Sequence, residues 1–171
     1  MLPGGRARQL GVLDRLVDRV NSSEVYAGAI LVGSLAADSV DAMSDVDLIV
    51  VVSVGRFPAA WASRSQLEGG ESIAAWDEVP SEGREAGAHK WLTADLVLVE
   101  ALLTCPSAGV HLAAPRRVVA GPPDLDEAFP MRARVARADM KTAESPIEAA
   151  YDRLKVTVRR ARRPDCGRTS N

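Results

Sequence analysis

Two strongly apolar segments, separated by only twelve residues, limit most strongly what this chain can fold into. Val25–Val32 and Asp45–Val54 are rich in β-branched and aliphatic residues, which predicts two buried strands, the second of them central in its sheet. The residues between them have room for a helix of two turns over Ser34–Val40 and a turn over Asp41–Ser44. Because this link is too short for the full crossover helix that joins parallel neighbours, we expect an antiparallel or mixed sheet.

Along the chain, helices are expected before and after this pair of strands. Gln9–Val20 has its apolar residues on one stripe and its charged residues off that stripe, as in an amphipathic helix. A second helix is predicted over Pro58–Leu67, with the proline in the first turn. The C-terminal stretch is also predicted to be helical, because Ser145 is a good cap and Pro146 suits the first helical position.

Three further strands are expected after the second helix. Ala88–Leu92 and Leu96–Leu103 read as a hairpin joined by the turn at residues 93–95, and Arg116–Ala120 reads as a short edge strand. The preceding stretch, Glu68–Gly87, is rich in Gly, Glu and Ser and is expected to be a mobile segment. The order of helices and strands therefore predicts an α/β fold with a mixed, largely antiparallel sheet flanked by helices.

Length and composition favour one compact unit without membrane contact. At 171 residues the chain is most simply one domain, with a core at residues 1–125 and a helical extension at 126–171. The extension is expected either to belong to the same compact domain or to contact a second copy. No apolar run is long enough to cross a bilayer, and Cys105 and Cys166 make no disulfide framework, so a reduced cytoplasmic protein is expected.

Charge is distributed unevenly along the chain. Residues 131–171 hold 11 Lys/Arg and 5 Asp/Glu, or +6, whereas residues 1–130 carry −8. A basic tail of this kind can contact nucleotide phosphates, nucleic acid or an acidic partner, or it can be the solvated face of a helix. The acidity of the larger part argues against a polymerase that holds a nucleic-acid template.

Two aspartates at the start of the second strand are the first candidate site residues. Side chains two apart on a strand share a face, with their α carbons about 6.6 Å apart, so Asp45 and Asp47 project together while Val46 takes the other face. At about 5 Å separation and an effective dielectric constant near 20, two such charges repel by about 3 kcal/mol. A hard divalent cation, Mg²⁺ or Mn²⁺, would reverse that repulsion.

The Gly33-Ser34 corner after the first strand has the complementary chemistry. Glycine lets a phosphate approach the backbone closely, and Ser34 adds a hydroxyl and a main-chain N–H at the start of the short predicted helix. Each feature alone is commonplace, since a Gly-Ser pair is usually a turn and an Asp-x-Asp pair is usually solvated. Together they bring phosphate donors and metal acceptors to one place, as metal-assisted phosphoryl transfer requires.

This combination resembles the nucleotidyltransferase superfamily, typified by polymerase β, kanamycin-type aminoglycoside nucleotidyltransferases and minimal nucleotidyltransferases. The matching residues are Gly33-Ser34 and Ser44–Leu48, within Val25–Val54. The resemblance implies a nucleotidyltransferase-like fold, to which the sequence adds the predicted C-terminal helices. It also implies a nucleotide-binding role for Gly33 and Ser34, and a catalytic, metal-binding role for Asp45 and Asp47. Many relatives carry Arg-Gly after the Gly-Ser corner, where this chain has Ala37-Asp38.

The family usually adds a third carboxylate from a neighbouring strand, as a metal ligand or as a base. Asp95 and Glu100 are the two candidates. Asp95 falls in the predicted hairpin turn, where aspartate is common for local reasons. Glu100 lies in an apolar strand, where a buried unpaired charge is costly, so we favour Glu100 as the catalytic and metal-binding residue. The alternative is that Glu100 lies on an open face or pairs with an arginine.

Other polar and aromatic residues have weaker signals. His89 and His111 lack zinc-ligand spacing and are expected at the surface or in loops. Lys90 and Arg116 could reach a triphosphate, although charged residues at strand edges are commonplace. The three tryptophans are expected to pack in or around the core.

The resemblance implies a Mg²⁺-dependent enzyme that transfers a nucleoside monophosphate, AMP from ATP, to a hydroxyl of a small molecule such as an aminoglycoside-like compound, or of a protein. One alternative is a minimal nucleotidyltransferase antitoxin that modifies a HEPN-type toxin. Another is a non-catalytic domain that binds a nucleotide or a partner. Because only about 40 residues remain for an acceptor domain, a homodimer could complete the site; no nucleic-acid partner is expected.

Overall fold

The computed structural model describes residues 5–41, 44–79, 83–112 and 114–130, together with Ala150 and Arg153. The chain divides into two compact units, residues 1–135 and 136–171. Ala150 and Arg153 are helical, and the rest of the predicted C-terminal helix lies outside the described residues. The helical extension at 126–171 therefore stays a prediction.

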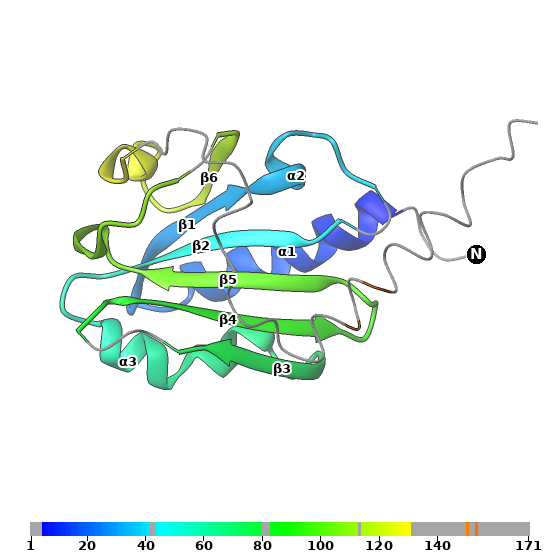
Figure 1. The fold of residues 1–171 in the computed structure, drawn as a ribbon, viewed down its shortest axis with the longest axis horizontal. Helices are drawn as coiled ribbons and strands as arrows, with labels where there is room; N and C mark the ends of the chain where they lie inside the picture. The colour runs from blue at the N-terminus through cyan, green and yellow to red at the C-terminus, as the bar shows by residue number, and fades with distance from the viewer. Residues whose placement is uncertain are drawn as a thin grey trace, which may run out of the picture. The chain divides into compact units, whose positions relative to one another are not determined.

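The first unit is built on a six-stranded sheet in the order β3-β4-β5-β2-β1-β6 (Figure 1). Its strands are β1 (Tyr26–Val32), β2 (Val46–Val52), β3 (Ser72–Glu78), β4 (Ala86–Thr93), β5 (Leu98–Thr104) and β6 (Arg116–Ala120). Its α-helices are α1 (Gly5–Asn21), α2 (Gly33–Ala36) and α3 (Phe57–Ala62), and short 3₁₀ helices are η1 (Arg64–Glu68), η2 (Pro106–Ala108) and η3 (Leu125–Ala128).

Strand directions confirm the predicted mixed, largely antiparallel sheet. β1 pairs antiparallel with β2 and with β6, and β4 pairs antiparallel with β3 and β5. Only β2 and β5 run parallel. The short link after β1 has the consequence expected from its length, since it turns the chain back so that Val32 lies opposite Asp47 on β2.

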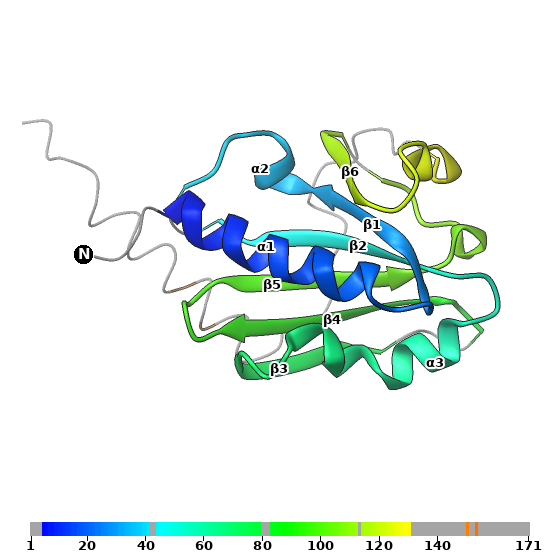
Figure 2. The same cartoon turned by 180° about the vertical axis from the view of Figure 1, so that it is seen from behind.

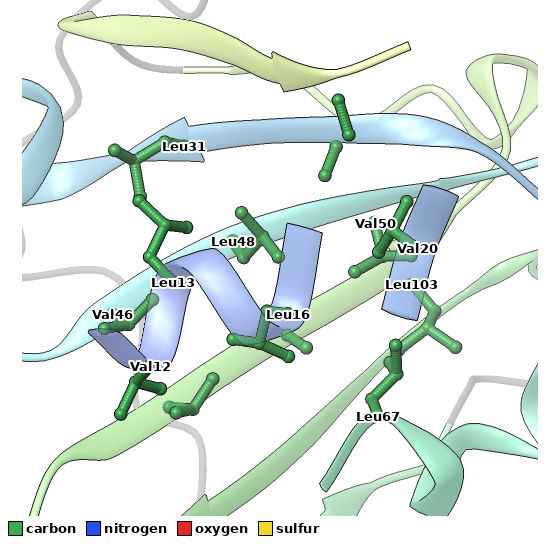
Figure 3. Close-up of a cluster of buried hydrophobic side chains, with 14 of the residues drawn as sticks. Val12, Leu13, Leu16, Val20, Leu31, Val46, Leu48, Val50, Leu67 and Leu103 are labelled. Carbon is green, nitrogen blue, oxygen red and sulfur yellow. The ribbon is translucent and has the colours of Figure 1, made fainter. Parts of the chain in front are cut away.

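One face of the sheet is covered by α1 (Figure 2). The apolar stripe of this helix, which includes Val12, Leu13, Leu16 and Val20, packs on residues of the central strands (Figure 3). These are alternate residues of β2, namely Val46, Leu48 and Val50, together with Leu31 and Leu103. Leu67 of η1 joins the same cluster, so the helical layer extends toward β4.

The opposite face has a smaller apolar cluster. Ile49 and Val51 of β2 lie there with Ile30 of β1, and Leu112 and Phe129 pack on them. Because side chains alternate along a strand, the residues of β2 that are absent from the α1 core point to this second face. Asp47 belongs to this second set.

Two local predictions need correction. Glu68–Gly87 was expected to be a mobile segment, but Ser72–Glu78 forms the edge strand β3, paired along its length with β4. Its alternating half-exposed residues have no continuous apolar run, so pairing with β4 rather than intrinsic preference holds the strand. The predicted helix at Pro58–Leu67 is divided into α3 and the 3₁₀ helix η1.

The short helix after β1 is also smaller than predicted. α2 is a single turn, Gly33–Ala36, in place of two turns over Ser34–Val40. Among the residues that the structure describes, no helix is both long and apolar enough to span a membrane.

Candidate active site

A single row of residues crosses all six strands on the face opposite α1. Asp47 of β2 lies opposite Val32 of β1 on one side and Glu100 of β5 on the other. Beyond these two the register continues on both sides, with Arg116 opposite Val32, Lys90 opposite Glu100, and Trp76 opposite Lys90. Four of the six positions are therefore occupied by ionisable side chains, although the strands themselves are largely apolar.

The two aspartates of the sequence motif differ in their position relative to β2. Asp47 is the second residue of β2, half-buried, between Val46 and Leu48, which both point into the α1 core. Asp45 is also half-buried, but it precedes the first residue of the strand. Because Asp45 lies outside the strand, alternation along β2 does not set its side chain, and its place on the same face as Asp47 stays a prediction.

The carboxylate of Asp47 lies against the backbone of Gly33. Gly33 has a φ of 72°, in the left-handed region that favours glycine. A Cβ atom at this position would overlap Oδ2 of Asp47 and would lie 3.2 Å from its Cγ. The glycine of the Gly-Ser corner is therefore required by the aspartate itself, and the two halves of the motif are in direct contact.

Ser34 and Asp38 complete the corner between β1 and β2. Ser34 is half-buried in α2, and its carbonyl accepts from the backbone N–H of Ser39 at 3.0 Å. Asp38 adopts a φ of 54°. Its carboxylate is bound by Arg6 of α1 at 2.7 Å, so an aspartate with a tied side chain takes the backbone conformation that suits glycine.

Glu100 is the carboxylate that the sheet places beside Asp47. Neighbouring strands are about 4.8 Å apart, so the two side chains leave adjacent strands at the same level. The Glu100 side chain is 42% exposed and accepts an ion pair from Lys90 at 3.3 Å. The argument from a buried charge was thus wrong for Glu100, and the pairing alternative is realised with a lysine in place of an arginine.

Lys90 joins Glu100 to a second glutamate. Its ammonium group lies 2.7 Å from Glu78 on β3, and the lysine side chain is only 5% exposed. The two glutamates are almost equally exposed, Glu78 at 41% and Glu100 at 42%. Lys90 therefore lies in the row between two carboxylates rather than at an open strand edge.

Asp95, the other candidate for the third carboxylate, lies elsewhere. It is exposed in the turn between β4 and β5, and its backbone carbonyl accepts from Arg8 of α1 at 2.9 Å. The register assigns the position opposite Asp47 to Glu100. Asp95 thus lies in the predicted hairpin turn, where aspartate is common for local reasons.

The donor set can be compared with what a divalent cation needs. Carboxylate oxygens suit hard cations; Asp47 and Glu100 provide them on one face, and Asp45 precedes Asp47 by two residues. In the described part of the chain, however, no group of three or more His, Cys, Asp or Glu side chains is arranged to hold a metal ion. The two aspartates fit the chemistry of such an ion, while Glu100 is engaged by Lys90.

His89 corrects the prediction of a surface or loop position. It is buried in β4, 5% exposed as a side chain, on the face opposite Lys90. Its Nδ1 lies 2.7 Å from Asp77 and its Nε2 lies 2.8 Å from Glu68. Hydrogen bonds from Arg64 to Asp77, at 2.7 and 2.8 Å, lower the pKa of that carboxyl group, and burial opposes this shift.

Sequence reasoning gave no role to Gln9, which is 1% exposed in α1. Its Nε2 donates to the carbonyls of Asp41 and Ser44 at 3.2 and 3.1 Å, at the entrance to β2. A signal was present, since Gln9 occupies the stripe that continues through Leu13 and Leu16 at helical spacing. A polar residue on an apolar stripe marks a buried side chain with a specific partner.

Comparisons with known proteins add little to this geometry. No protein-family model and no curated protein matches the chain. Among solved structures it is similar to "structure of GLD-2/RNP-8 complex", with a TM-score of 0.46 and 15% sequence identity. The similarity covers 61% of this chain and 42% of that one, so this chain corresponds to less than half of the neighbour's length. A likeness of this size concerns the fold and says nothing of the activity.

Proposed function

We propose that this protein is a nucleotidyltransferase that transfers the nucleoside monophosphate of a nucleoside triphosphate, ATP, to a hydroxyl group. The observation that carries the proposal is the contact between Gly33 and the carboxylate of Asp47. It brings the glycine corner against Asp47, one of the two aspartates of the motif. A connection with a purely structural role has no need to set a half-buried carboxylate against an exposed glycine.

A divalent cation, Mg²⁺ or Mn²⁺, is part of the proposal. Asp45 and Asp47 would hold it, with Glu100 as a third ligand or as a base. When bound, such an ion supplies charge stabilisation at the triphosphate. Lys90 bears on the choice of role for Glu100, because its positive charge beside the glutamate opposes a cation at the same oxygen atoms. This favours Glu100 as the base.

The chain's own residues divide the remaining tasks. Gly33 is exposed in addition to its contact with Asp47, so a phosphate would reach its backbone from solvent, with the Ser34 hydroxyl beside it. The hydroxyl oxygen of the acceptor would bond to the α-phosphorus while the bond to the pyrophosphate oxygen breaks. The hydroxyl proton would pass to the carboxylate of Glu100. Lys90, on the side of Glu100 away from Asp47, would hold the Glu100 carboxylate in place through their ion pair.

The acceptor is proposed to be a small molecule with several hydroxyl groups, such as an aminoglycoside-like compound. A protein acceptor is the second possibility, as in an antitoxin that modifies a HEPN-type toxin. The test uses α-labelled ATP with Mg²⁺, a panel of aminoglycosides and a cell extract. Label on a panel member supports the first acceptor class, and label on a protein band supports the second.

Asp47→Asn and Asp38→Asn make a matched pair for this test. Both remove one negative charge near the β1–β2 corner, but only Asp47 contacts Gly33. We expect transfer to fall at least about 100-fold in Asp47→Asn, because several kcal/mol of charge stabilisation is lost, and to persist in Asp38→Asn. Equal transfer by the wild type and Asp47→Asn would overturn the proposal. A rise in melting temperature with ATP and Mg²⁺ but no transfer to any acceptor would indicate a non-catalytic nucleotide-binding domain.

A further inference from the structure

Asp45 and Asp47 are fixed by different parts of the fold. Asp47 lies within β2 and is held by ladders to β1 and β5 on its two sides. The strand and both of its ladders begin at or after Val46, so Asp45 lies outside the strand. The backbone of Asp45 is therefore held through Ser44, the residue before it, rather than by the ladders of the sheet.

Ser44 is bound to Asp41 through both its side chain and its backbone. The Ser44 hydroxyl accepts from the backbone N–H of Asp41 at 2.9 Å and contacts Oδ1 of the same aspartate at 3.0 Å. The backbone N–H of Ser44 also donates to the Asp41 carbonyl at 3.2 Å. Residues 41 and 44 thus form a compact unit whose two carbonyl groups point toward α1.

Gln9 holds both of these carbonyl groups. Its Nε2 donates to the carbonyl of Asp41 at 3.2 Å and to that of Ser44 at 3.1 Å. Since a peptide unit is planar, fixing the Ser44 carbonyl also fixes the backbone nitrogen of Asp45. One buried side chain of α1 therefore sets the plane from which Asp45 begins.

A glutamine at this position costs desolvation free energy. The next positions on the same stripe, Leu13 and Leu16, are apolar and buried in the α1 core. Gln9 is equally buried, and its Oε1 has no hydrogen-bond partner among the described residues. The site tolerates a desolvated amide oxygen in order to keep two N–H donors on the turn.

We infer that Gln9 is a positioning residue for Asp45 in the proposed nucleotidyltransferase site. It acts through the Ser44–Asp45 peptide and touches neither the cation nor the nucleotide. The inference rests on the proposed function, because it gives Asp45 the role of a cation ligand. It separates the two aspartates, since Asp47 is set by the sheet and Asp45 by the helix.

The test measures Mn²⁺ binding in the presence of a non-hydrolysable ATP analogue. Gln9→Met keeps the length of the side chain and removes both N–H donors. We expect the dissociation constant for Mn²⁺ to rise about 10-fold or more, as when a group that orients a metal ligand is lost. The KM for ATP at saturating Mn²⁺ should change by less than about 3-fold, because the Gly33 corner is untouched.

Val12→Ala is the matched control. Val12 lies one turn further along α1 and is 3% exposed, so its truncation weakens the same helix contact without touching the turn. We expect Mn²⁺ affinity in Val12→Ala to stay within about 2-fold of the wild type. An equal loss in Val12→Ala would show that loosening α1 is enough, and would overturn the inference.

A double-mutant cycle makes the test specific to Asp45. If Gln9 acts through Asp45, Gln9→Met should cause no further loss of Mn²⁺ affinity in an Asp45→Asn background. An undiminished further loss there would overturn the inference. If the wild type binds Mn²⁺ and Gln9→Met binds it equally well, the inference fails while the proposed function stands. If the wild type itself binds no Mn²⁺ with the nucleotide, the proposed function fails, and the inference falls with it.

Discussion

Polar residues have different surroundings on the two faces of the sheet, and two neighbouring residues of β4 show the difference. On the face covered by α1 and η1, His89 is buried between Asp77 and Glu68, and each ring nitrogen has a carboxylate partner. On the other face the next residue, Lys90, belongs to a row that continues through Glu100 to Asp47. In the first cluster the polar side chains pair with one another. The row on the other face reaches Asp47, which contacts the exposed Gly33.

This difference separates a polar cluster that stabilises the fold from one that can act on a ligand. Asp77 is bound by Arg64 as well as by His89, and Glu68 is bound by His89, so each carboxylate of the first cluster has a partner within it. In the second cluster, the row places Asp47 and Glu100 with Lys90 and Arg116, and Arg116 is also bound by Asp126. Asp47 lies beside an exposed glycine corner, where carboxylate oxygens suit a hard cation.

The largest expected difference between the two faces concerns two neighbouring residues of β2. Leu48 is 1% exposed in the α1 core, whereas Asp47 faces the row. We expect Leu48→Ala to lower the free energy of unfolding by about 2–5 kcal/mol, the cost of a cavity in a packed core. Asp47→Asn should change it by less than about 1 kcal/mol, since the side chain is only half-buried.

Urea unfolding measures both variants, and label transfer at a temperature where both are folded completes the comparison. Leu48→Ala should retain transfer, and Asp47→Asn should lose it. A large loss of stability in Asp47→Asn with normal transfer would assign the aspartate to the fold and remove the distinction between the faces.

Gly33→Ala tests the contact between the glycine corner and Asp47. The new methyl group would overlap the Asp47 carboxylate, and the left-handed backbone at φ 72° costs a non-glycine residue about 1–2 kcal/mol. We expect a loss of that size in the free energy of unfolding and a loss of transfer comparable to that in Asp47→Asn. Gly55→Ala is the control, because Gly55 has a similar φ of 73° but no atom within 4 Å of an added Cβ. Transfer should fail in Gly33→Ala alone, and failure in both variants would count against a special role for the corner.

Glu100→Gln tests whether the carboxylate of Glu100 contributes to transfer. Glu78→Gln is its matched control, since both glutamates pair with Lys90 and are equally exposed, but only Glu100 lies opposite Asp47. We expect transfer to fall about 10- to 100-fold in Glu100→Gln, within the range typical for a general base, and to change by less than about 2-fold in Glu78→Gln. Equal rates in the two variants would reduce Glu100 to an ion-pair partner of Lys90.

Much of this arrangement was predictable because it depends on local spacing. The short link after β1 required the turn-back that puts Val32 opposite Asp47, and alternation along β2 separated Asp47 from Leu48. The preference for Glu100 over Asp95 agrees with the register, although the reason given for it, a buried charge, was wrong. Whether these residues act as ligands or base is still a prediction.

The remaining features depend on partners far along the chain. β3 has a weak pattern of its own and exists through its pairing with β4. His89 is buried because Glu68 and Asp77, 21 and 12 residues away, meet at its ring, and no single-strand pattern indicates this. Gln9 finds its carbonyl partners 32 and 35 residues further on. Sequence spacing predicts which face a side chain takes but not what meets it there.

The smallest expected effect concerns Asp77, on the face of the sheet that α1 covers. Because Arg64 and His89 hold the pKa of Asp77 below its ordinary value, ionised Asp77 favours the folded state. This contribution is fully present above the ordinary carboxyl pKa of about 4 and is lost as the pH falls through the lower pKa of the folded state. Asp77→Asn should therefore cost about 1 kcal/mol near pH 6, with the difference from the wild type shrinking as the pH falls below about 4. Urea unfolding across this pH range measures the effect, with exposed Asp124→Asn as the control. Label transfer near neutral pH should be unchanged in Asp77→Asn, because its cluster lies on the α1 face; a loss of transfer without a loss of stability would mean that the two faces are not independent.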